Sequence, residues 1–408
     1  MTGTESLSLR YGAAESLTIR LDRDRIELLQ PAPEPLTEFG DQVAAALDRP
    51  IDFPPLEQMV VPGDRVAIAL AADTPGASQI IAATWNVLER RDVRPEDIVV
   101  IQPPAARNGR DPRLELPEAI RDRVKWVVHD PGDAERCRYL SATAGGERVY
   151  LAREITESDV VLPVGPIAFD AVLGYRGPFS VLYPGLSSHE AITRSQGQGH
   201  SELEPDNERP LRQLIDEIGW LLGIQFCIQV VPAAGVGAGD VLAGCPEGVF
   251  RDGREQLADR WLVTLTQRPE TVVISVSSDA GGHGWDQVGR ALKTARNLVA
   301  HDGRIVLLTD LDEDPGEGLQ LVRSSQAPGE ALQPLRRTAP DDLAAATHLA
   351  AAADWAHVFL LSRLDGDLVE DLFLTPLAGP RDVERLLGGN GRCAVIEDAQ
   401  HSWGRVVD

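Results

Sequence analysis

Short, uninterrupted apolar runs recur along this chain, and stretches with apolar residues at helical spacing separate several of them. In the first half, the runs are residues 66–71, 98–101, 126–128 and 160–164. After the first run, Ile81, Trp85 and Leu88 follow the i, i+4, i+7 spacing of a helix face. Because strands that alternate with helices form right-handed βαβ units, we expect a mainly parallel sheet with helices on both faces.

A second set with the same pattern begins near residue 260. Its predicted strands, each with a run of apolar residues, are 272–276, 303–309, 357–362 and 393–398, and a helix with Val288, Leu292 and Val299 on one face follows the first strand. At 408 residues the chain is too long for one core. We therefore expect an α/β fold of two domains with mainly parallel sheets, residues 1–255 and a smaller domain of residues 256–408, with a boundary between 248 and 260.

Three segments outside these patterns also carry expectations. Residues 7–30 alternate apolar and polar side chains, which predicts an opening β-hairpin or meander. The Gly/Pro/Glu-rich segment 312–329 predicts a surface loop. The uncharged stretch 218–239 changes from a helical to an extended pattern near Gly223, which predicts a helix end and a buried strand rather than a membrane span.

The expected ligand crevice follows from the parallel sheet. Ligands in such sheets bind beyond the carboxyl ends of the strands. Asp73, the loop after Ile101, His129 and the stretch after Gly165 all follow predicted strands. We therefore expect these segments to converge on one crevice, with the ligand lying between the two domains.

Charge and residue usage exclude several classes of partner. The net charge is −24, which repels phosphate backbones and anionic headgroups, so neither nucleic acid nor membrane is an expected partner. The four cysteines form no CxxC pair and no signal peptide opens the chain, which predicts a cytoplasmic protein. Lys125 and Lys293 are the two lysines, so amine chemistry is confined to these side chains.

The segment LGYRGPFSVLYPG, residues 173–185, is the most unusual in the chain. Its glycines permit either close backbone approach to an anion or a tight connection between two strands. No phosphate loop occurs, and the glycine-rich segments 237–244 and 281–285 lack the spacing of a dinucleotide site. GxSxG is absent and no histidine pair has HxxxH or HExxH spacing, so neither a hydrolase site nor a metal site can be derived from spacing.

Gln287 and Arg290 lie i, i+3 on the helix that opens after residues 281–284. They face the same way, near the positive end of the helix. This face is either solvated or forms a clamp for a carboxylate or phosphate, whose oxygens match the planar fork of arginine.

Taken in order, these segments resemble the nickel-dependent lactate racemase family, whose broader members are 2-hydroxyacid racemases and epimerases. The resemblance includes LSLRYG, ALDRPIDFPPLEQMVVPGDRVAIALAADTP, HDPGD, TESDVVLPVGPI and the glycine-rich segment. It continues through NERPLRQLIDEIGWLLGIQFCIQVV and WDQVGRALKTARNLVAHDGRIVLL, so it spans nearly the whole chain.

The resemblance also shows where this chain departs from the family. Relatives carry a nickel pincer nucleotide attached to a lysine and ligated by a histidine, two other histidines exchange the substrate's α-proton, and the metal centre transiently accepts hydride. Alignment through the shared PG places the tether lysine on Ser180, a proton-transfer histidine on Asp170 and the nickel-ligand histidine on Gln196. Residues 103–110 contain no histidine where the family has GTHR.

Other family positions are retained in part. The aspartate of the family's DxTRP motif is present as Asp73, whereas Gly76 stands where the family has the arginine of this motif. Gln287 and Arg290 match family glutamine and lysine positions. Since serine cannot form the tether and glutamine is a poor nickel ligand, the cofactor is unknown and no metal ligand is expected. An amine from Lys125 or Lys293 inside the crevice, pointing at clustered histidine side chains, would overturn this expectation.

The resemblance implies a lactate racemase-like protein, a divergent 2-hydroxyacid racemase or epimerase acting on a small hydroxyacid or similar anion. The alternative is a noncatalytic ligand-binding or regulatory protein of the same fold, and the oligomeric state stays open. Asp170, as general base, and Asp73 are the expected catalytic groups. The expected substrate-binding residues are Tyr175, Arg176, Gln287 and Arg290, and the cofactor positions are Gly174, Gly177 and Ser180.

Overall fold

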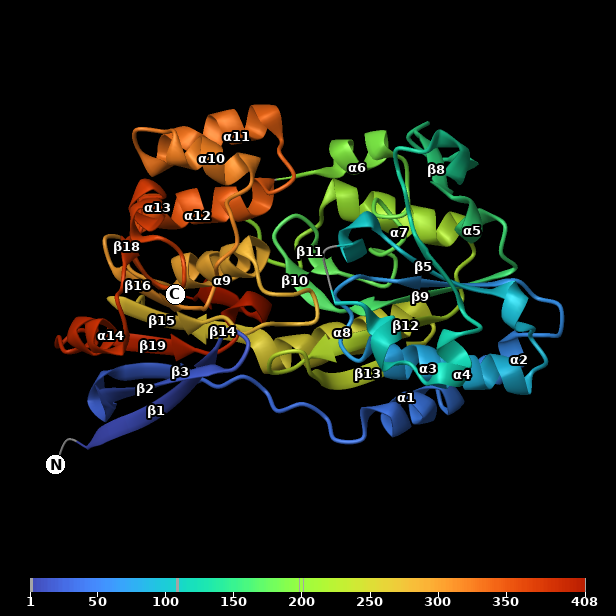
Figure 1. Cartoon of the computed structure of the whole chain (residues 1–408), viewed down its shortest axis with the longest axis horizontal. Helices are drawn as coiled ribbons and strands as arrows, with labels where there is room; N and C mark the ends of the chain where they lie inside the picture. The colour runs from blue at the N-terminus through green and yellow to red at the C-terminus, as the bar shows by residue number, and fades with distance from the viewer. Residues whose placement is uncertain (1–2, 108–109, 198, 201, 408) are drawn as a thin grey trace.

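The computed structural model describes residues 3–107, 110–197, 199–200 and 202–407. Asn108 and Gly109, in the predicted loop after Ile101, lie outside the described residues. Two six-stranded sheets lie side by side, each with helices on its faces (Figure 1). No helix in the described ranges is both long and apolar enough to cross a membrane.

The first sheet has the strand order β13-β12-β9-β4-β5-β6, and its neighbours pair in parallel except for β12 and β13. Its strands are β4 (Val66–Leu70), β5 (Ile98–Gln102), β6 (Lys125–Val128), β9 (Val160–Pro166), β12 (Cys227–Pro232) and β13 (Ala238–Gly244). In β4, Ile68 joins the core on one face and Ala67 the core on the other. A strand buried on both faces is apolar throughout, which confirms the pattern used to predict it.

Helices from the first half of the chain cover both faces of this sheet. One face carries α1 (Phe39–Asp48), α2 (Leu56–Met59), α3 (Ala77–Arg90) and α4 (Glu118–Arg121). The other carries α5 (Arg153–Thr156), α6 (His189–Ser195) and α7 (Pro210–Leu221). Two antiparallel hairpins lie beside the sheet, namely β7 (Cys137–Ala142) with β8 (Arg148–Ala152) and β10 (Ala168–Asp170) with β11 (Gly174–Arg176).

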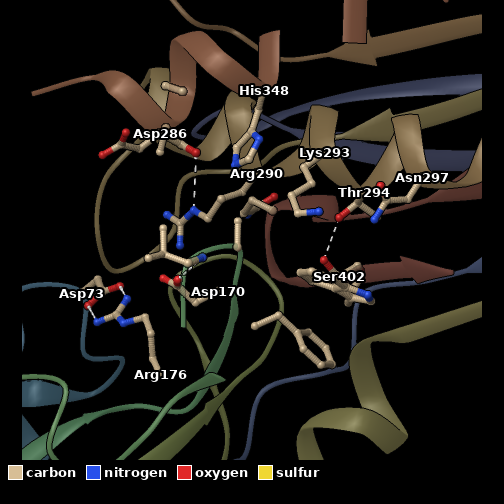
Figure 2. Close-up of a pocket in the computed structure, with 17 residues that line it drawn as sticks. Asp73, Asp170, Arg176, Asp286, Arg290, Lys293, Thr294, Asn297, His348 and Ser402 are labelled. Atoms are coloured by element: carbon tan, nitrogen blue, oxygen red, sulfur yellow. Dashed lines mark hydrogen bonds and ion pairs between the residues drawn. The ribbon is translucent and has the colours of Figure 1, made fainter. Parts of the chain in front are cut away.

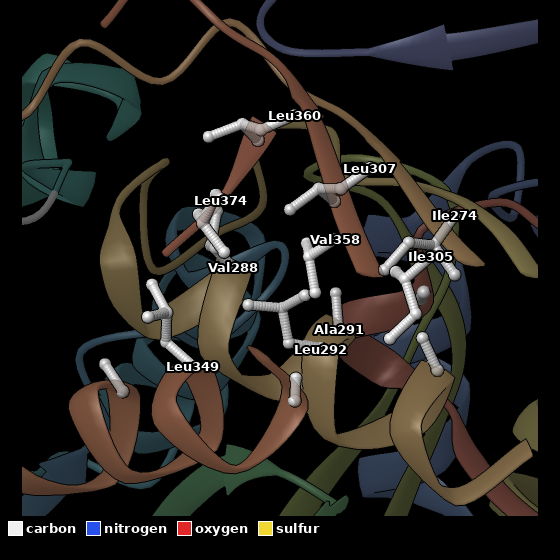
Figure 3. Packing of buried hydrophobic residues seen from close by; sticks show 14 of the residues in the cluster. Ile274, Val288, Ala291, Leu292, Ile305, Leu307, Leu349, Val358, Leu360 and Leu374 are labelled. Carbon is white, nitrogen blue, oxygen red and sulfur yellow. The ribbon is translucent and has the colours of Figure 1, made fainter. Parts of the chain in front are cut away.

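The second sheet is parallel throughout and has the order β18-β17-β16-β15-β19-β3. Its strands are β3 (Ile26–Gln30), β15 (Thr271–Ser275), β16 (Arg304–Leu308), β17 (His357–Leu361), β18 (Thr375–Pro376) and β19 (Cys393–Ile396). All four apolar runs predicted for this half form strands. Central to its core is α9 (Trp285–Leu298), whose Val288 and Leu292 pack against sheet residues such as Ile305 (Figure 3).

The faces of the second sheet are covered by elements from both ends of the chain. Together with α9, one face carries α10 (Glu317–Arg323), α11 (Leu332–Thr338), α12 (Leu343–Trp355) and α13 (Gly366–Asp371). The other is covered by the hairpin β1 (Thr4–Tyr11) and β2 (Glu15–Asp22), and by α14 (Pro380–Leu387). The predicted opening hairpin is thus present, and it packs on the second sheet.

The sheets divide the chain differently from the predicted boundary at residue 255. β3 pairs with β19, so residues 4–30 belong structurally with the second sheet. The helix α8 (Pro246–Trp261) runs unbroken through residues 248–260 and packs on β12 and β13. Directly after it, β14 (Leu262–Leu265) pairs with β20 (Trp403–Val406). The two-domain division by residue number therefore stays a prediction.

The predicted surface loop over residues 312–329 is wrong in its middle, where the chain forms α10. The backbone N–H groups of Gly318 and Leu319 donate to the carboxylate of Asp342, at 2.7 and 3.0 Å. Asp342 precedes α12, so a residue distant in sequence supplies acceptors to the start of α10. Local patterns could not show this helix because its capping group is not local.

Asp398, which follows β19, connects the two halves of the molecule. Its Oδ1 accepts a hydrogen bond from the N–H of Ser277 at 3.0 Å, and its Oδ2 accepts one from the N–H of Gly235 at 2.9 Å. Ser277 follows β15 in the second sheet, and Gly235 lies between β12 and β13 in the first. The carboxylate is buried, so this contact is protected from water.

Candidate functional site

A cavity of about 270 Å³ lies between the two halves of the molecule (Figure 2). Its walls come from the loop after β4, the β10–β11 hairpin, α9, α12 and the residues just before β20. The lining residues are Asp73, Phe169, Asp170, Ala171, Val172, Arg176, Asp286, Arg290, Lys293, Thr294, Asn297, Ala344, Ala345, His348, Gln400, Ser402 and Trp403. We call this cavity the interdomain pocket.

Asp73 and Arg176 form an ion pair on one wall of the interdomain pocket. The Nη2 of Arg176 donates to Oδ1 of Asp73 at 2.8 Å, and its Nη1 donates to Oδ2 of the same carboxylate. Although burial opposes ionisation of the carboxyl, the guanidinium beside it holds the pKa of Asp73 well below its usual range. The pKa of Arg176 is raised by the same contact, against the opposing effect of its burial. The two predicted site residues therefore neutralise each other.

Asp170 ends β10 and enters the turn of the hairpin. Its Oδ1 accepts hydrogen bonds from the N–H groups of Val172 and Leu173, both at 2.7 Å. Gly174 closes this turn with φ 77°, and a Cβ there would lie 2.2 Å from the carbonyl oxygen of Pro205. Glycine is thus required at this position, which places Asp170 at the pocket wall. Among the described residues, no hydrogen bond engages its Oδ2.

α9 brings a line of polar residues to the opposite wall. Arg290 lines the pocket, and its Nε donates to the carbonyl oxygen of Asp286 at 3.4 Å. Its Nη2 lies 3.9 Å from Oδ2 of Asp279, too far for a hydrogen bond. Gln287 instead turns inward, where its Nε2 donates to Asp279 at 3.0 Å and its Oε1 accepts the N–H of Gly284 at 3.1 Å. Gln287 and Arg290 therefore do not act together as the predicted clamp, because Arg290 faces the cavity and Gln287 does not.

Lys293 lies one helical turn after Arg290 and also lines the pocket (Figure 2). Its side chain is 7% exposed, and its Nζ lies 4.2 Å from the centre of the Trp403 ring. Within the described structure, this Nζ has no hydrogen-bond partner. Burial, reinforced by the nearby cation of Arg296, lowers the pKa of Lys293 to about 8. Lys293 therefore brings an amine into the crevice, whereas Ser180, at the position of the family tether, is not among the lining residues.

His348 reaches the same cavity from α12. Burial, together with the nearby cations of Lys293 and Arg296, lowers the pKa of His348 to about 3. The imidazole is therefore neutral near pH 7, when it can accept or donate a hydrogen bond without carrying charge. This contact could not be predicted from the sequence, because His348 has no motif around it and lies 55 residues after Lys293 in the chain.

Several predicted site residues lie outside the interdomain pocket. The ring of Tyr175 is buried against Phe169 and Phe250, with centroids 5.5 and 6.2 Å away, so it packs in a core rather than facing a ligand. His129 is buried and its Nε2 lies 2.8 Å from the carbonyl oxygen of Ser187, away from Asp73 and Asp170. The predicted convergence thus holds for Asp73 and the hairpin after Gly165, but not for His129.

The positions that hold the family cofactor do not fit it in this chain. Ser180 supplies no amine, and its Oγ accepts the N–H of Gly177 at 2.9 Å, which closes a local turn. The Nε2 of Gln196 donates to Asp341 at 3.2 Å. Gly76 has φ 63°, and a Cβ there would lie 2.2 Å from the ring of Phe39, so no arginine fits in this backbone. In the described ranges, no cluster of three or more His, Cys, Asp or Glu side chains is arranged to hold a metal ion.

The structure thus brings together Asp73, Asp170, Arg176 and Arg290 among the predicted residues, and it adds Lys293 and His348. A signal for Lys293 was present, since Gln287, Arg290 and Lys293 recur every three residues on one helix. What the arrangement can do chemically follows from its charges. Arg290 and Lys293 can bind a carboxylate, and Asp170 can accept a proton from a ligand held between them.

Comparisons with known proteins agree with this architecture. Residues 11–203 match the lactate racemase N-terminal domain model. A lactate racemase from Thermoanaerobacterium thermosaccharolyticum is 19% identical over 280 residues, and the match spans 65% of this chain and 65% of that protein's length.

Two solved structures share the fold at low sequence identity. The lactate racemase apoprotein from Thermoanaerobacterium thermosaccharolyticum has a TM-score of 0.80 at 18% identity, over 98% of this chain and 100% of that chain. A crystal structure of a protein from Thermotoga maritima has a TM-score of 0.69 at 12% identity, over 92% of this chain and 100% of that chain. The expected α/β fold and the resemblance on which it rested are therefore confirmed.

Proposed function

We propose that this lactate racemase-like chain binds a small 2-hydroxy carboxylate in the interdomain pocket and inverts the carbon that bears the hydroxyl. One observation carries the proposal. Two cationic side chains on α9, Arg290 and Lys293, face Asp170 across a cavity in a chain whose net charge is −24. The lining of the pocket holds as many carboxylates as cationic side chains, but Arg290 and Lys293 place two cations one turn apart on α9, which favours an anionic group of the ligand at that wall.

The two cations bind the carboxylate in different ways. Arg290 offers a planar fork, and in the part of the chain that the structure describes no side-chain carboxylate lies within hydrogen-bond distance of it. The ammonium of Lys293 is buried and has no hydrogen-bond partner among the described residues, so an anion that reaches it gains a strong, desolvated interaction. Ligand affinity should therefore depend on both side chains.

Inversion then needs a proton acceptor and a proton donor from different sides of the ligand. Asp170, from the first half of the molecule, takes the proton from the carbon that carries the hydroxyl. Lys293, from the second half, returns a proton to the other face of that carbon, and its pKa of about 8 suits a donor near neutral pH. Arg290 stabilises the negative charge that develops on the carboxylate. A catalytic role for Asp73 and a substrate-binding role for Gln287 stay predictions.

The experiment that tests this function is solvent deuterium incorporation. Purified protein is incubated with each enantiomer of lactate in D₂O, and deuterium at the inverted carbon is followed by mass spectrometry. We expect inversion with incorporation, and we expect Asp170→Asn and Lys293→Met each to lower the rate at least about 100-fold. Lys125→Met, the matched change at the other lysine, is exposed on β6 and should leave the rate unchanged. Inversion that keeps the substrate's own hydrogen would contradict the proposal.

A noncatalytic ligand-binding protein is the second candidate. Oδ1 of Asp170 already accepts two backbone N–H groups, so the carboxylate is held in a fixed position where it can orient a ligand without removing a proton from it. In that case lactate or a similar hydroxyacid raises the unfolding temperature without any exchange of the α-proton. The same D₂O samples, measured for stability as well as exchange, separate the two candidates.

A further inference from the structure

A second cavity of about 130 Å³ adjoins the interdomain pocket, and Lys293 and His348 line both. It lies among α9, α11 and α12, and Gly199 and His200 close it from the first half of the molecule. We call it the second cavity. None of the other residues that line the interdomain pocket reaches it, so the two are neighbouring compartments with a shared wall.

Three hydrogen-bond donors of the second cavity have no partner in the described structure. They are Nζ of Lys293, Nε of Arg296 and Oγ1 of Thr347, and each atom is buried. Lys293 is 93% buried as a residue, since its exposed fraction is 7%. A buried donor without an acceptor costs about 1–3 kcal/mol, and more when it is charged. Three such donors around one small cavity indicate that a ligand with several acceptor atoms completes the site.

The charges around this cavity favour an anion. Its lining residues include Lys293, Arg296 and Arg336, and no carboxylate is among the lining residues that the structure describes. Glu202 and Glu204 act on Lys293 from outside the lining, and Asp354 acts on Arg296, yet burial and neighbouring cations outweigh them for both groups. An oxyanion would therefore enter a site of net positive charge.

We propose that the second cavity binds a phosphate group. A tetrahedral oxyanion offers acceptors in several directions at once, as the donors from α9 and α12 require, whereas a carboxylate offers two oxygens in one plane. Lys293 and Arg296 lie one turn apart on α9, about 4.5 Å along its axis, so both can reach one phosphate.

The phosphate has two possible sources with the same chemistry. It is either free inorganic phosphate or the far end of a ligand whose 2-hydroxy carboxylate occupies the interdomain pocket. The second source rests on the proposed function, because it needs that pocket to hold the carboxylate. The shared wall of Lys293 and His348 makes such a ligand a phosphorylated hydroxyacid, for which 3-phosphoglycerate is a suitable probe.

The test is calorimetric titration with lactate, inorganic phosphate and 3-phosphoglycerate. We expect phosphate or 3-phosphoglycerate to bind, and Arg296→Gln to weaken that binding at least about tenfold, the loss of one charge-assisted contact. Thr347→Val, which keeps the side-chain shape and charge, should weaken it about threefold. Arg385→Gln is the matched control, because this exposed arginine lies on α14.

The outcomes separate the sources and the two proposals. If 3-phosphoglycerate excludes both lactate and phosphate, one ligand spans both compartments, and if lactate and phosphate bind together, the phosphate is free. Either result supports the second cavity as a phosphate site. Lactate binding without any phosphate binding, or phosphate binding that neither variant weakens, would overturn the inference and leave the proposed function intact. Phosphate binding without lactate binding would instead contradict the proposed function.

Discussion

At the scale of single residues, Lys293 decides the chemistry of this molecule. The sequence showed that amines are scarce and that the family tether position is Ser180, and both statements hold in the structure. It also showed Lys293 three residues after Arg290 on one helix. It could not show that Trp403 and His348, from elements far along the chain, enclose the amine. Burial of a charge is a property of tertiary packing, so residue spacing alone does not contain it.

The buried amine of Lys293 is expected to lower the stability of the folded protein while serving the proposed function. The pKa of Lys293 is about 8 in the folded protein against 10.5 for a free lysine, so protonation favours unfolding. The penalty is fully present below pH 8 and disappears as the pH rises through 10.5, where both states carry a neutral amine. The difference corresponds to about 3 kcal/mol. We therefore expect Lys293→Met to be more stable than the parent protein near neutral pH, with the difference vanishing at high pH.

Urea denaturation across this pH range measures the effect directly. The control is Lys125→Met, which removes an exposed lysine and should change the free energy of unfolding by less than about 0.5 kcal/mol. A Lys293→Met protein that is less stable than the parent near neutral pH would show that the amine has a favourable role in the folded state.

At the scale of elements, the apolar runs predicted the strands correctly, whereas the start of one helix could not be predicted from local capping residues. β4, β5 and β9 were predicted because each side of a buried strand faces a core. By contrast, α10 was missed because Asp342, which accepts from its first N–H groups, lies beyond the helix in sequence. β3 was recognised only as part of an alternating segment, since its partner β19 lies at the other end of the chain.

The non-local cap of α10 can be tested by Asp342→Ala. This change leaves the N–H groups of Gly318 and Leu319 without their acceptors, and we expect it to lower the free energy of unfolding by about 1 kcal/mol. Chemical denaturation gives the value, with Asp314→Ala as a control because Asp314 is exposed in the segment before α10. Equal stability of the two variants would mean that α10 does not depend on this cap.

At the scale of the whole molecule, the two sheets do not follow the order of the chain. Residues 4–30 complete the second sheet, by pairing β3 with β19 and by covering one face with the β1–β2 hairpin. A fragment of residues 256–408 lacks these elements and exposes both a strand edge and an apolar face. We expect this fragment to be insoluble or aggregated, and a fusion that adds residues 3–35 to restore a soluble monomer.

Size-exclusion chromatography and thermal unfolding of the two proteins check this expectation. A fragment of residues 256–408 that is monomeric and unfolds cooperatively by itself would support the division at residue 255. It would contradict the division in which residues 4–30 are part of the second unit. The sequence predicted two α/β units, but it could not show which strands belong to which unit. Strand partners are set by the tertiary fold rather than by order in the chain.

Two of the hydrogen-bonded links between the halves differ in their exposure to water. The carboxylate of Asp398 is buried and accepts hydrogen bonds from the N–H groups of Ser277 and Gly235. The side chains of Gln196 and Asp341 instead form one hydrogen bond at the surface. Water competes for the surface bond and cannot reach the buried pair. We therefore expect any opening of the molecule to break the exposed Gln196–Asp341 bond before the buried bonds of Asp398, so that a ligand would enter from the side of Gln196.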